Sequence, residues 1–262
     1  MDRDELHARM HGNFASNSKE PSTQNDEKDR FQIAFEKEID TYVDAMELED
    51  DPNHKEFLPP KLRREKIKTE LKAAAKMEEL SRLLETAVKL LISEGADYLA
   101  PETYQQLTAD LSNAYTQIEN INLDHPAEID IPSAVQLSNE SLLAIATIAT
   151  KKFANESYMD CLSLFSFLSV LHPEHPEYWF RLAIAAQKVG NLDMASRAYA
   201  AVSELDPQHI GARLFGAECF LQRDLKNEAK AEVEAAKEIA KNNQIEKMWL
   251  ELLPQIEILV KS

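Results

Sequence analysis

The sequence predicts an all-α protein, and two observations support that prediction. Ala, Leu, Glu and Lys, which favour helix, are abundant among the 262 residues, whereas only 5 residues are glycine. Apolar residues also recur every three or four positions over most of the chain, which is the spacing of a helix with one buried face. We therefore expect a chain of helices joined by short connections.

Residues 1–57 are polar and acidic, and we expect them to form a largely disordered tail. Within this tail Phe31, Phe35 and Ile39 recur at helical spacing, which indicates one short amphipathic segment. A segment of this length buries little apolar surface by itself. It therefore either docks on another surface or forms a transient helix.

Residues 58–121 are predicted to form a helical hairpin. Prolines at 59 and 60 open the first helix and Gly95 closes it, so we expect one amphipathic helix of about 35 residues. Residues 101–121 repeat the apolar period, and two neighbouring amphipathic helices bury their faces most simply against each other. Two prolines then interrupt residues 122–136, which we assign as a linker.

Residues 137–262 contain an internal repeat. Three segments align at a 34-residue step and begin at Leu142, Pro176 and Ile210. This step is the period of the tetratricopeptide repeat, in which two antiparallel helices pack closely through small residues. The second copy has the residues of that pattern, which are Trp179, Leu182, Ala183, Gly190, Ala195, Tyr199 and Pro207.

The third copy is weaker than the second. Gly216 stands at the leucine position and Asp224 at the turn glycine, and terminal repeats are commonly atypical because they face solvent. Residues 243–262 add a further amphipathic helix that would cover the open end. We therefore predict a three-repeat tetratricopeptide superhelix with a C-terminal capping helix, preceded by the helical hairpin and the disordered tail.

The repeat register also predicts a peptide-binding groove. The first helix of each pair lines the concave face of such a superhelix, where large apolar residues are not needed to pair the two helices. The candidate groove residues are Thr147, Thr150, Phe153, Phe180, Arg181, Ile184, Gln187, Leu214, Phe215, Glu218 and Leu221.

The third copy has a further pattern, an Ala-Glu-Cys step at residues 217–219, followed by Phe220 and Leu221, a turn, and the pair Glu228 and Ala229. With this pattern, residues 137–259 resemble the class II chaperones of bacterial type III secretion. The resemblance implies a cytoplasmic bacterial protein linked to virulence, with no catalytic residue and no cofactor. It also implies secreted translocator proteins as partners, kept soluble and unassembled before export by binding of an extended hydrophobic segment in the groove.

Composition and charge exclude several other classes of protein. The formal net charge of −17 repels phosphate, so we expect neither nucleic acid nor an anionic membrane as a partner. No run approaches the roughly 18 apolar residues of a membrane span, so we expect no membrane insertion. The 2 cysteines lie far apart, which indicates small core residues rather than a disulfide. The histidines at 172, 175 and 209 fall at turns between helices, so we predict no metal site and no catalytic site.

Other interaction proteins fit the same repeats. A needle-subunit chaperone or a scaffold of the same secretion apparatus is the main alternative. A co-chaperone that captures a C-terminal carboxylate is disfavoured, because Ala146 and Thr150 stand where its Lys and Asn clamp would be. In a third hypothesis, the N-terminal helices are the main interaction device and the repeats are a docking platform for them. The length of the predicted first helix also suggests a homodimer.

Overall fold

The structure is a computed structural model that describes residues 30–46, 60–75, 77–121, 135–242 and 245–261. These residues form an all-α protein, as predicted, and they contain no β-strand. The helices are α2 (Arg30–Ala45), α3 (Pro60–Ala75), α4 (Met77–Tyr98), α5 (Pro101–Glu119), α7 (Asn139–Ala154), α8 (Tyr158–Leu171), α9 (Pro176–Lys188), α10 (Leu192–Leu205), α11 (Ile210–Gln222), α12 (Lys226–Asn242) and α13 (Lys247–Lys261).

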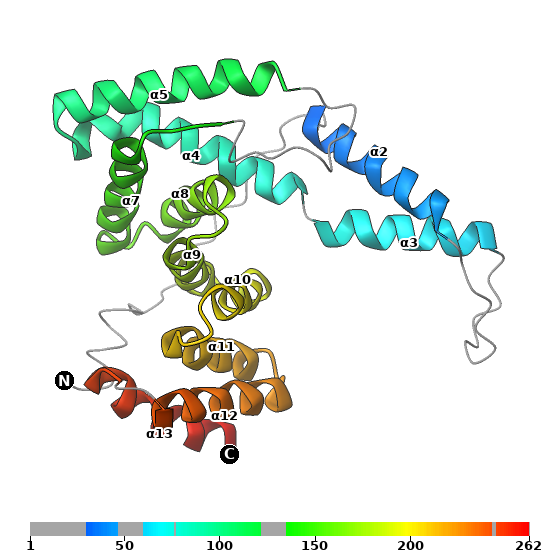
Figure 1. The fold of residues 1–262 in the computed structure, drawn as a ribbon, viewed down its shortest axis with the longest axis vertical. Coiled ribbons are helices and arrows are strands. Elements are labelled where there is room, and N and C mark those ends of the chain that lie inside the picture. The colour runs from blue at the N-terminus through cyan, green and yellow to red at the C-terminus, as the bar shows by residue number, and fades with distance from the viewer. Residues whose placement is uncertain (1–29, 47–59, 76, 122–134, 243–244, 262) are drawn as a thin grey trace.

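Helices α7 to α12 form three antiparallel pairs that stack in chain order, and α13 follows at the end of the stack (Figure 1). The turn inside each pair has one residue with positive φ, namely Glu156 at 61°, Gly190 at 80° and Asp224 at 62°. These three positions are 34 residues apart, so the predicted repeat register is confirmed in the backbone. Glycine adopts this conformation without strain, and a non-glycine residue adopts it at a modest cost.

Small residues let the two helices of the second repeat approach closely, as predicted. Ala183 on α9 and Ala195 on α10 are fully buried. Tyr199 fills the space beside them, and its hydroxyl donates a hydrogen bond to Gln187 Oε1 at 3.0 Å, which satisfies a buried polar group.

Within the predicted hairpin, α4 and α5 are in contact, and α4 continues through Gly95 to Tyr98, so the expectation that Gly95 closes the helix is wrong. Helices α3 and α4 run in different directions (Figure 1), and residue 76 between them lies outside the described residues. A Cβ at Gly95 would lie 2.9 Å from the ring of Tyr104. Gly95 therefore allows close packing of α5 on α4 instead of ending the helix.

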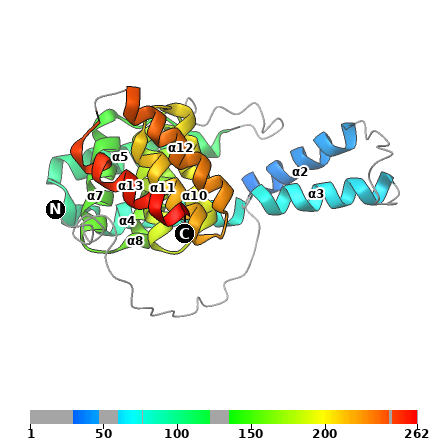
Figure 2. The ribbon, with the colours of Figure 1, turned by 90° about the horizontal axis from the view of Figure 1, so that it is seen from below.

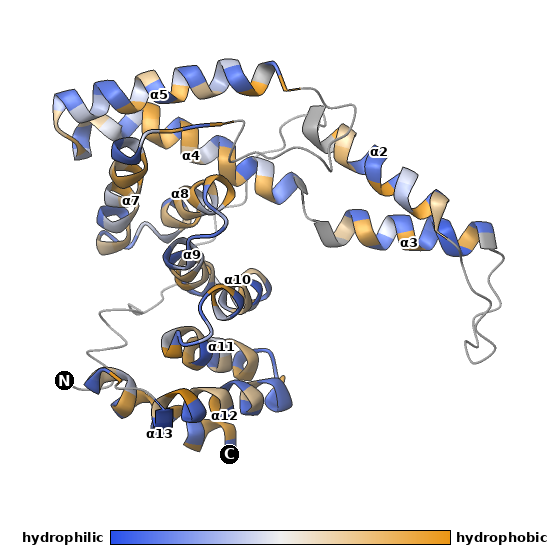
Figure 3. Ribbon diagram, in the orientation of Figure 1, coloured by the Kyte–Doolittle hydropathy of each residue, from blue (hydrophilic) through white to orange (hydrophobic). Residues whose placement is uncertain are grey.

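Helices α4 and α5 pack directly on the first repeat. The most apolar helix, α8 (Figure 3), contacts α7, α9 and α4. Most of its residues are buried, whereas Met159 in its first turn is 57% exposed. One hydrophobic core runs from Leu83 on α4 to Ile256 on α13. This shared core joins the hairpin helices α4 and α5 to the repeats. The division of the chain into domains at residues 57, 121 and 136 stays a prediction.

Lys152 ties α4 to the first repeat. Its buried ammonium lies 2.6 Å from Glu94 Oε2 on α4 and 2.8 Å from Asp160 Oδ2 on α8. Burial opposes the charged form, but the hydrogen bonds from Lys152 to the two carboxylates outweigh it and hold the pKa of Lys152 above its ordinary value.

Asp110 makes the matching connection from α5 to the start of α7. Its Oδ2 accepts hydrogen bonds from the Ser138 backbone N–H at 3.0 Å and from the Ser141 hydroxyl at 2.7 Å. Burial raises the pKa of Asp110, but these hydrogen bonds and that from the Ser138 hydroxyl outweigh it and lower the pKa below its ordinary value. Ser138 also caps α7, so one carboxylate positions the first helix of the repeats.

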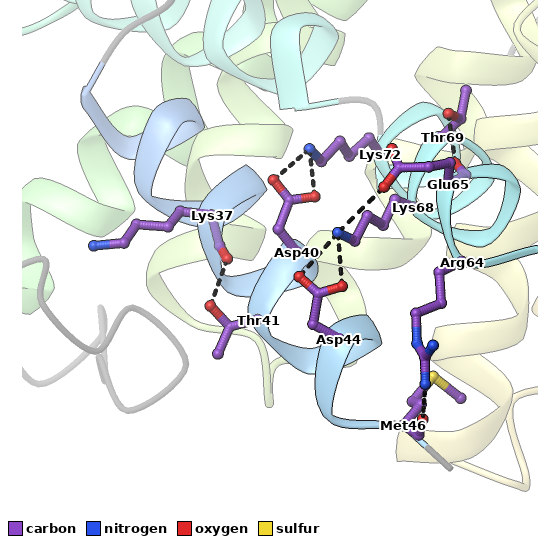
Figure 4. Close-up of polar contacts among 10 residues, drawn as sticks. All are labelled: Lys37, Asp40, Thr41, Asp44, Met46, Arg64, Glu65, Lys68, Thr69 and Lys72. Atoms are coloured by element: carbon purple, nitrogen blue, oxygen red, sulfur yellow. Dashed lines mark hydrogen bonds and ion pairs between the residues drawn. The ribbon is translucent and has the colours of Figure 1, made fainter. Parts of the chain in front are cut away.

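Helices α2 and α3 form a separate antiparallel arm that extends away from the repeats (Figures 1 and 2). Lys68 and Lys72 of α3 point toward α2 and form ion pairs with Asp44 and Asp40 at 2.9 and 2.7 Å (Figure 4). The amphipathic segment predicted in the tail is therefore a helix with α3 as its partner. The remainder of the predicted tail lies outside the described residues.

Candidate functional site: the concave face of the repeats

A pocket of about 250 Å³ lies between the first and second repeats, on the face that the repeat register predicts to be concave. Its lining residues come mainly from α7 and α9, the first helices of the two pairs, and are Thr150, Phe153, Phe165, Glu177, Phe180, Arg181 and Ile184. Five of the eleven predicted groove residues are in this set. The register therefore brings these five side chains together, and their function in binding stays a prediction.

The pocket has apolar walls and a charged rim. Ile184 and Phe180 are almost fully buried, whereas Arg181 and Glu177 are each 44% exposed and form an ion pair with Nε and Oε1 2.7 Å apart. The ring of Phe153 packs edge-on against Tyr158 with centroids 5.2 Å apart, which fixes that wall. Such a site would hold an apolar group and leave polar groups beside it in water.

The third repeat contributes much less to the open groove than predicted. Leu214 is 0% exposed and Phe215 is 2% exposed, so both are core residues. Trp249 on α13 covers Phe215, because its indole packs edge-on against the Phe215 ring with centroids 5.6 Å apart. A Cβ at Gly211 would lie only 2.7 Å from the same indole, so this glycine lets α13 approach α11.

Sequence reasoning identified the capping helix but missed the inward position of Trp249. The available signal in the sequence was Gly211, in the first turn of α11. The equivalent residue of the second repeat is Glu177. Glycine at a helical position without a turn often marks a close approach by another group.

The remaining predicted groove residues are not part of the pocket lining. The Thr147 hydroxyl, like that of Thr150 in the pocket, donates a hydrogen bond to the backbone carbonyl four residues earlier, at 2.8 Å. Gln187 is buried and accepts from Tyr199, and Leu221 packs against the core at the far end of α11. Glu218 is buried on α11.

Lys188 is a further residue that the sequence did not single out. Its side chain is buried, and its ammonium lies 5.3 Å from the centre of the Tyr158 ring. Burial lowers the pKa of Lys188 to about 8, while the nearby Glu218 opposes that shift. A cation beside an aromatic ring is stabilised electrostatically, which explains how this lysine is accommodated.

Comparison with known proteins places the fold in context. No family model matches the chain, and no curated protein matches it. Solved structures do match, and they include type III secretion translocator chaperones. The Yersinia enterocolitica type III secretion chaperone SycD, in complex with a peptide of the translocator YopD, is 22% identical and has a TM-score of 0.44, over 48% of this chain and 94% of SycD.

Two further structures are similar to this chain at comparable TM-scores. PcrH in complex with the chaperone-binding region of PopD is 18% identical with a TM-score of 0.44, over 48% of this chain and 92% of that one. A chain of the CopN–Scc3 complex is 19% identical with a TM-score of 0.45, over 69% of this chain and 97% of that one.

Among the described residues, no group of three or more His, Cys, Asp or Glu side chains is arranged to hold a metal ion. No described helix is both long and apolar enough to cross a membrane. Cys161 and Cys219 are free and buried, as predicted, and burial raises the pKa of each thiol to about 12.

Proposed function

We propose that this protein is a cytosolic chaperone of type III secretion translocators that binds an extended client segment on the concave face of its repeats. The observation that carries the proposal is the open apolar pocket between α7 and α9, at residues that the repeat register selects for ligand contact. The class of client comes from the resemblance of residues 137–259, above all the Ala-Glu-Cys step of the third repeat.

The mechanism is occlusion of apolar client surface without a chemical step. The pocket is already formed in the free protein, and its walls are held by the packing of α7, α8 and α9. A preformed receptor loses little conformational entropy on binding, so most of the ordering cost falls on the client segment. The exposed ion pair of Glu177 and Arg181 keeps the rim hydrated, which favours reversible binding suited to release before export.

Co-expression of the full chain with candidate translocators, followed by co-purification, tests this proposal. The double variant Thr150→Glu and Arg181→Glu changes two exposed positions at the pocket, and we expect it to fold and to lose the client. Ala231→Glu, at an exposed position on α12, is the matched control and should retain the client. Retention of the client by the pocket variant would contradict the groove as the binding surface.

The N-terminal helices offer two further proposals that the sequence already suggested. In one, the N-terminal helices are the main interaction device, and removal of residues 1–76, which include α2 and α3, would then weaken client protection while leaving α4 in place. In the other, the protein forms a homodimer through its N-terminal helices. Light scattering of the full chain would give twice the 29.7 kDa of one copy if it dimerises, and a monomeric mass would contradict dimerisation.

A further inference from the structure

The pocket lies where the first repeat lacks a side chain that the other repeats have. Ala146, Phe180 and Leu214 are equivalent positions, because each is 34 residues from the next. In the second and third repeats this position carries a large apolar side chain that is 8% and 0% exposed. In the first repeat it carries only the methyl group of Ala146, one helical turn before Thr150 of the pocket lining.

The surroundings of Phe180 show what such a position encloses. Its ring lies 6.0 Å, centroid to centroid, from Tyr199 of the same repeat, and 6.0 Å from Phe215 of the next, with the two phenyl planes 15° apart. One repeat earlier, the residues equivalent to Tyr199 and Phe215 are Phe165 and Arg181. Both line the pocket. The pocket therefore has walls equivalent to those around Phe180, but no ring equivalent to that of Phe180 lies between them.

From this equivalence we propose that the pocket takes one aromatic side chain of the bound client segment, in the place that a phenylalanine at position 146 would fill. This inference rests on the proposed function and adds the chemistry of the anchoring residue. The volume of about 250 Å³ lies below the roughly 300–1,000 Å³ of sites for whole small molecules, which fits a single side chain.

Charge complementarity favours an aromatic ring over an aliphatic side chain. Arg181 stands where Phe215 stacks on Phe180, so its guanidinium would lie against the face of an inserted ring. The face of an aromatic ring is electronegative and attracts a cation, whereas a leucine or valine side chain has no such face. Phe165 and Phe180 would supply edge or offset contacts from the other sides.

A titration of the full chain with two small probes tests the inference. N-acetylphenylalanine methylamide and N-acetylleucine methylamide are each added to isotope-labelled protein, and backbone amide resonances are followed by NMR. The phenylalanine probe should shift the amides of Thr150, Phe153 and Ile184 with a dissociation constant about two- to tenfold lower than that of the leucine probe. Equal affinities, or shifts confined to other surfaces, would overturn the proposal.

The variant Ala146→Phe fills the pocket with a ring from the protein itself. It should raise the midpoint of thermal unfolding by about 2–4 °C and abolish the shifts caused by the phenylalanine probe. Ala231→Phe, on the exposed face of α12, is the matched control and should leave probe binding unchanged. Undiminished binding of the probe to a folded Ala146→Phe variant would also overturn the proposal.

The result separates this inference from the proposed function. A wild-type protein that binds the phenylalanine probe in the pocket but co-purifies with no translocator would contradict the client class and leave the aromatic site standing. A protein that retains a translocator but binds both probes equally would contradict the aromatic site alone.

Discussion

The contact between Gly211 and Trp249 makes a sharp prediction about stability. An alanine at a helical position is normally more stable than glycine by up to about 1 kcal/mol. At Gly211 the added Cβ would lie 2.7 and 2.9 Å from two atoms of the Trp249 indole, well inside the roughly 3.5–4.0 Å of ordinary carbon contacts. The indole must therefore move, and Gly211→Ala should destabilise the protein.

The magnitude follows from two opposing effects. Overpacking of this kind typically costs about 1–3 kcal/mol, and the helix preference for alanine returns up to about 1 kcal/mol. We expect a net loss of about 1–2 kcal/mol in the free energy of unfolding. In a Trp249→Ala background the two closest contacts are removed, and only Phe180 Cζ remains near the added Cβ, at 3.2 Å. The same substitution should then cost much less than in the wild type, or stabilise the protein by up to about 1 kcal/mol if the Phe180 ring shifts.

Urea unfolding followed by circular dichroism measures all four members of this double-mutant cycle without relying on tryptophan fluorescence. A loss of stability in the wild-type background that is much smaller, or reversed, in the Trp249→Ala background is the expected result. If Gly211→Ala stabilised both backgrounds equally, the packing of α13 over the third repeat would be refuted.

Three other predictions concern buried and partly buried polar groups. Lys152→Met leaves two partly exposed carboxylates facing each other, so it should lower the free energy of unfolding by about 1–3 kcal/mol. Urea denaturation measures this loss, and an unchanged midpoint would contradict the connection of α4 to the first repeat through Lys152. The lowered pKa of Asp110 stabilises the fold above the ordinary carboxyl pKa of 3.8, and this contribution is lost as the pH falls below 3.8 through the pKa of the folded state. Asp110→Asn should therefore be less stable than the wild type at pH 7, and the difference should shrink in thermal melts at pH 3, whereas a constant difference would refute the assignment. The raised pKa values of Cys161 and Cys219 predict no reaction with a thiol reagent at pH 8 in the folded state, and rapid labelling of either without denaturant would show that it is not buried.

The sequence was sufficient to predict the repeat stack because each repeat is specified locally. Gly190 had to lie in a tight turn, and Ala183 and Ala195 had to face each other, since only small residues allow the observed approach of α9 and α10. The 34-residue period of the repeats also placed Asp224 at the equivalent turn of the third repeat. A 34-residue period also assigned Thr150 and Arg181 to one face, and both line the pocket.

Other features depended on contacts between distant segments, which no local pattern contains. The apolar period continues from α3 into α4, so the sequence predicted one long helix. Helical spacing alone does not reveal that α3 packs against α2 whereas α4 packs against the first repeat. Gly95 looked like a helix end, yet the ring of Tyr104 makes it a packing position. The burial of Phe215 likewise depends on Trp249, 34 residues away in sequence.

Site-specific photocrosslinking in the co-expressed complex tests the central claim most directly. A photoreactive phenylalanine analogue at position 150 or 181 replaces an exposed residue of the pocket lining, and one at position 231 lies on the exposed face of α12. Crosslinks to a translocator from positions 150 and 181, and none from position 231, are the predicted result. Crosslinks from position 231 alone would contradict binding of the client on the concave face.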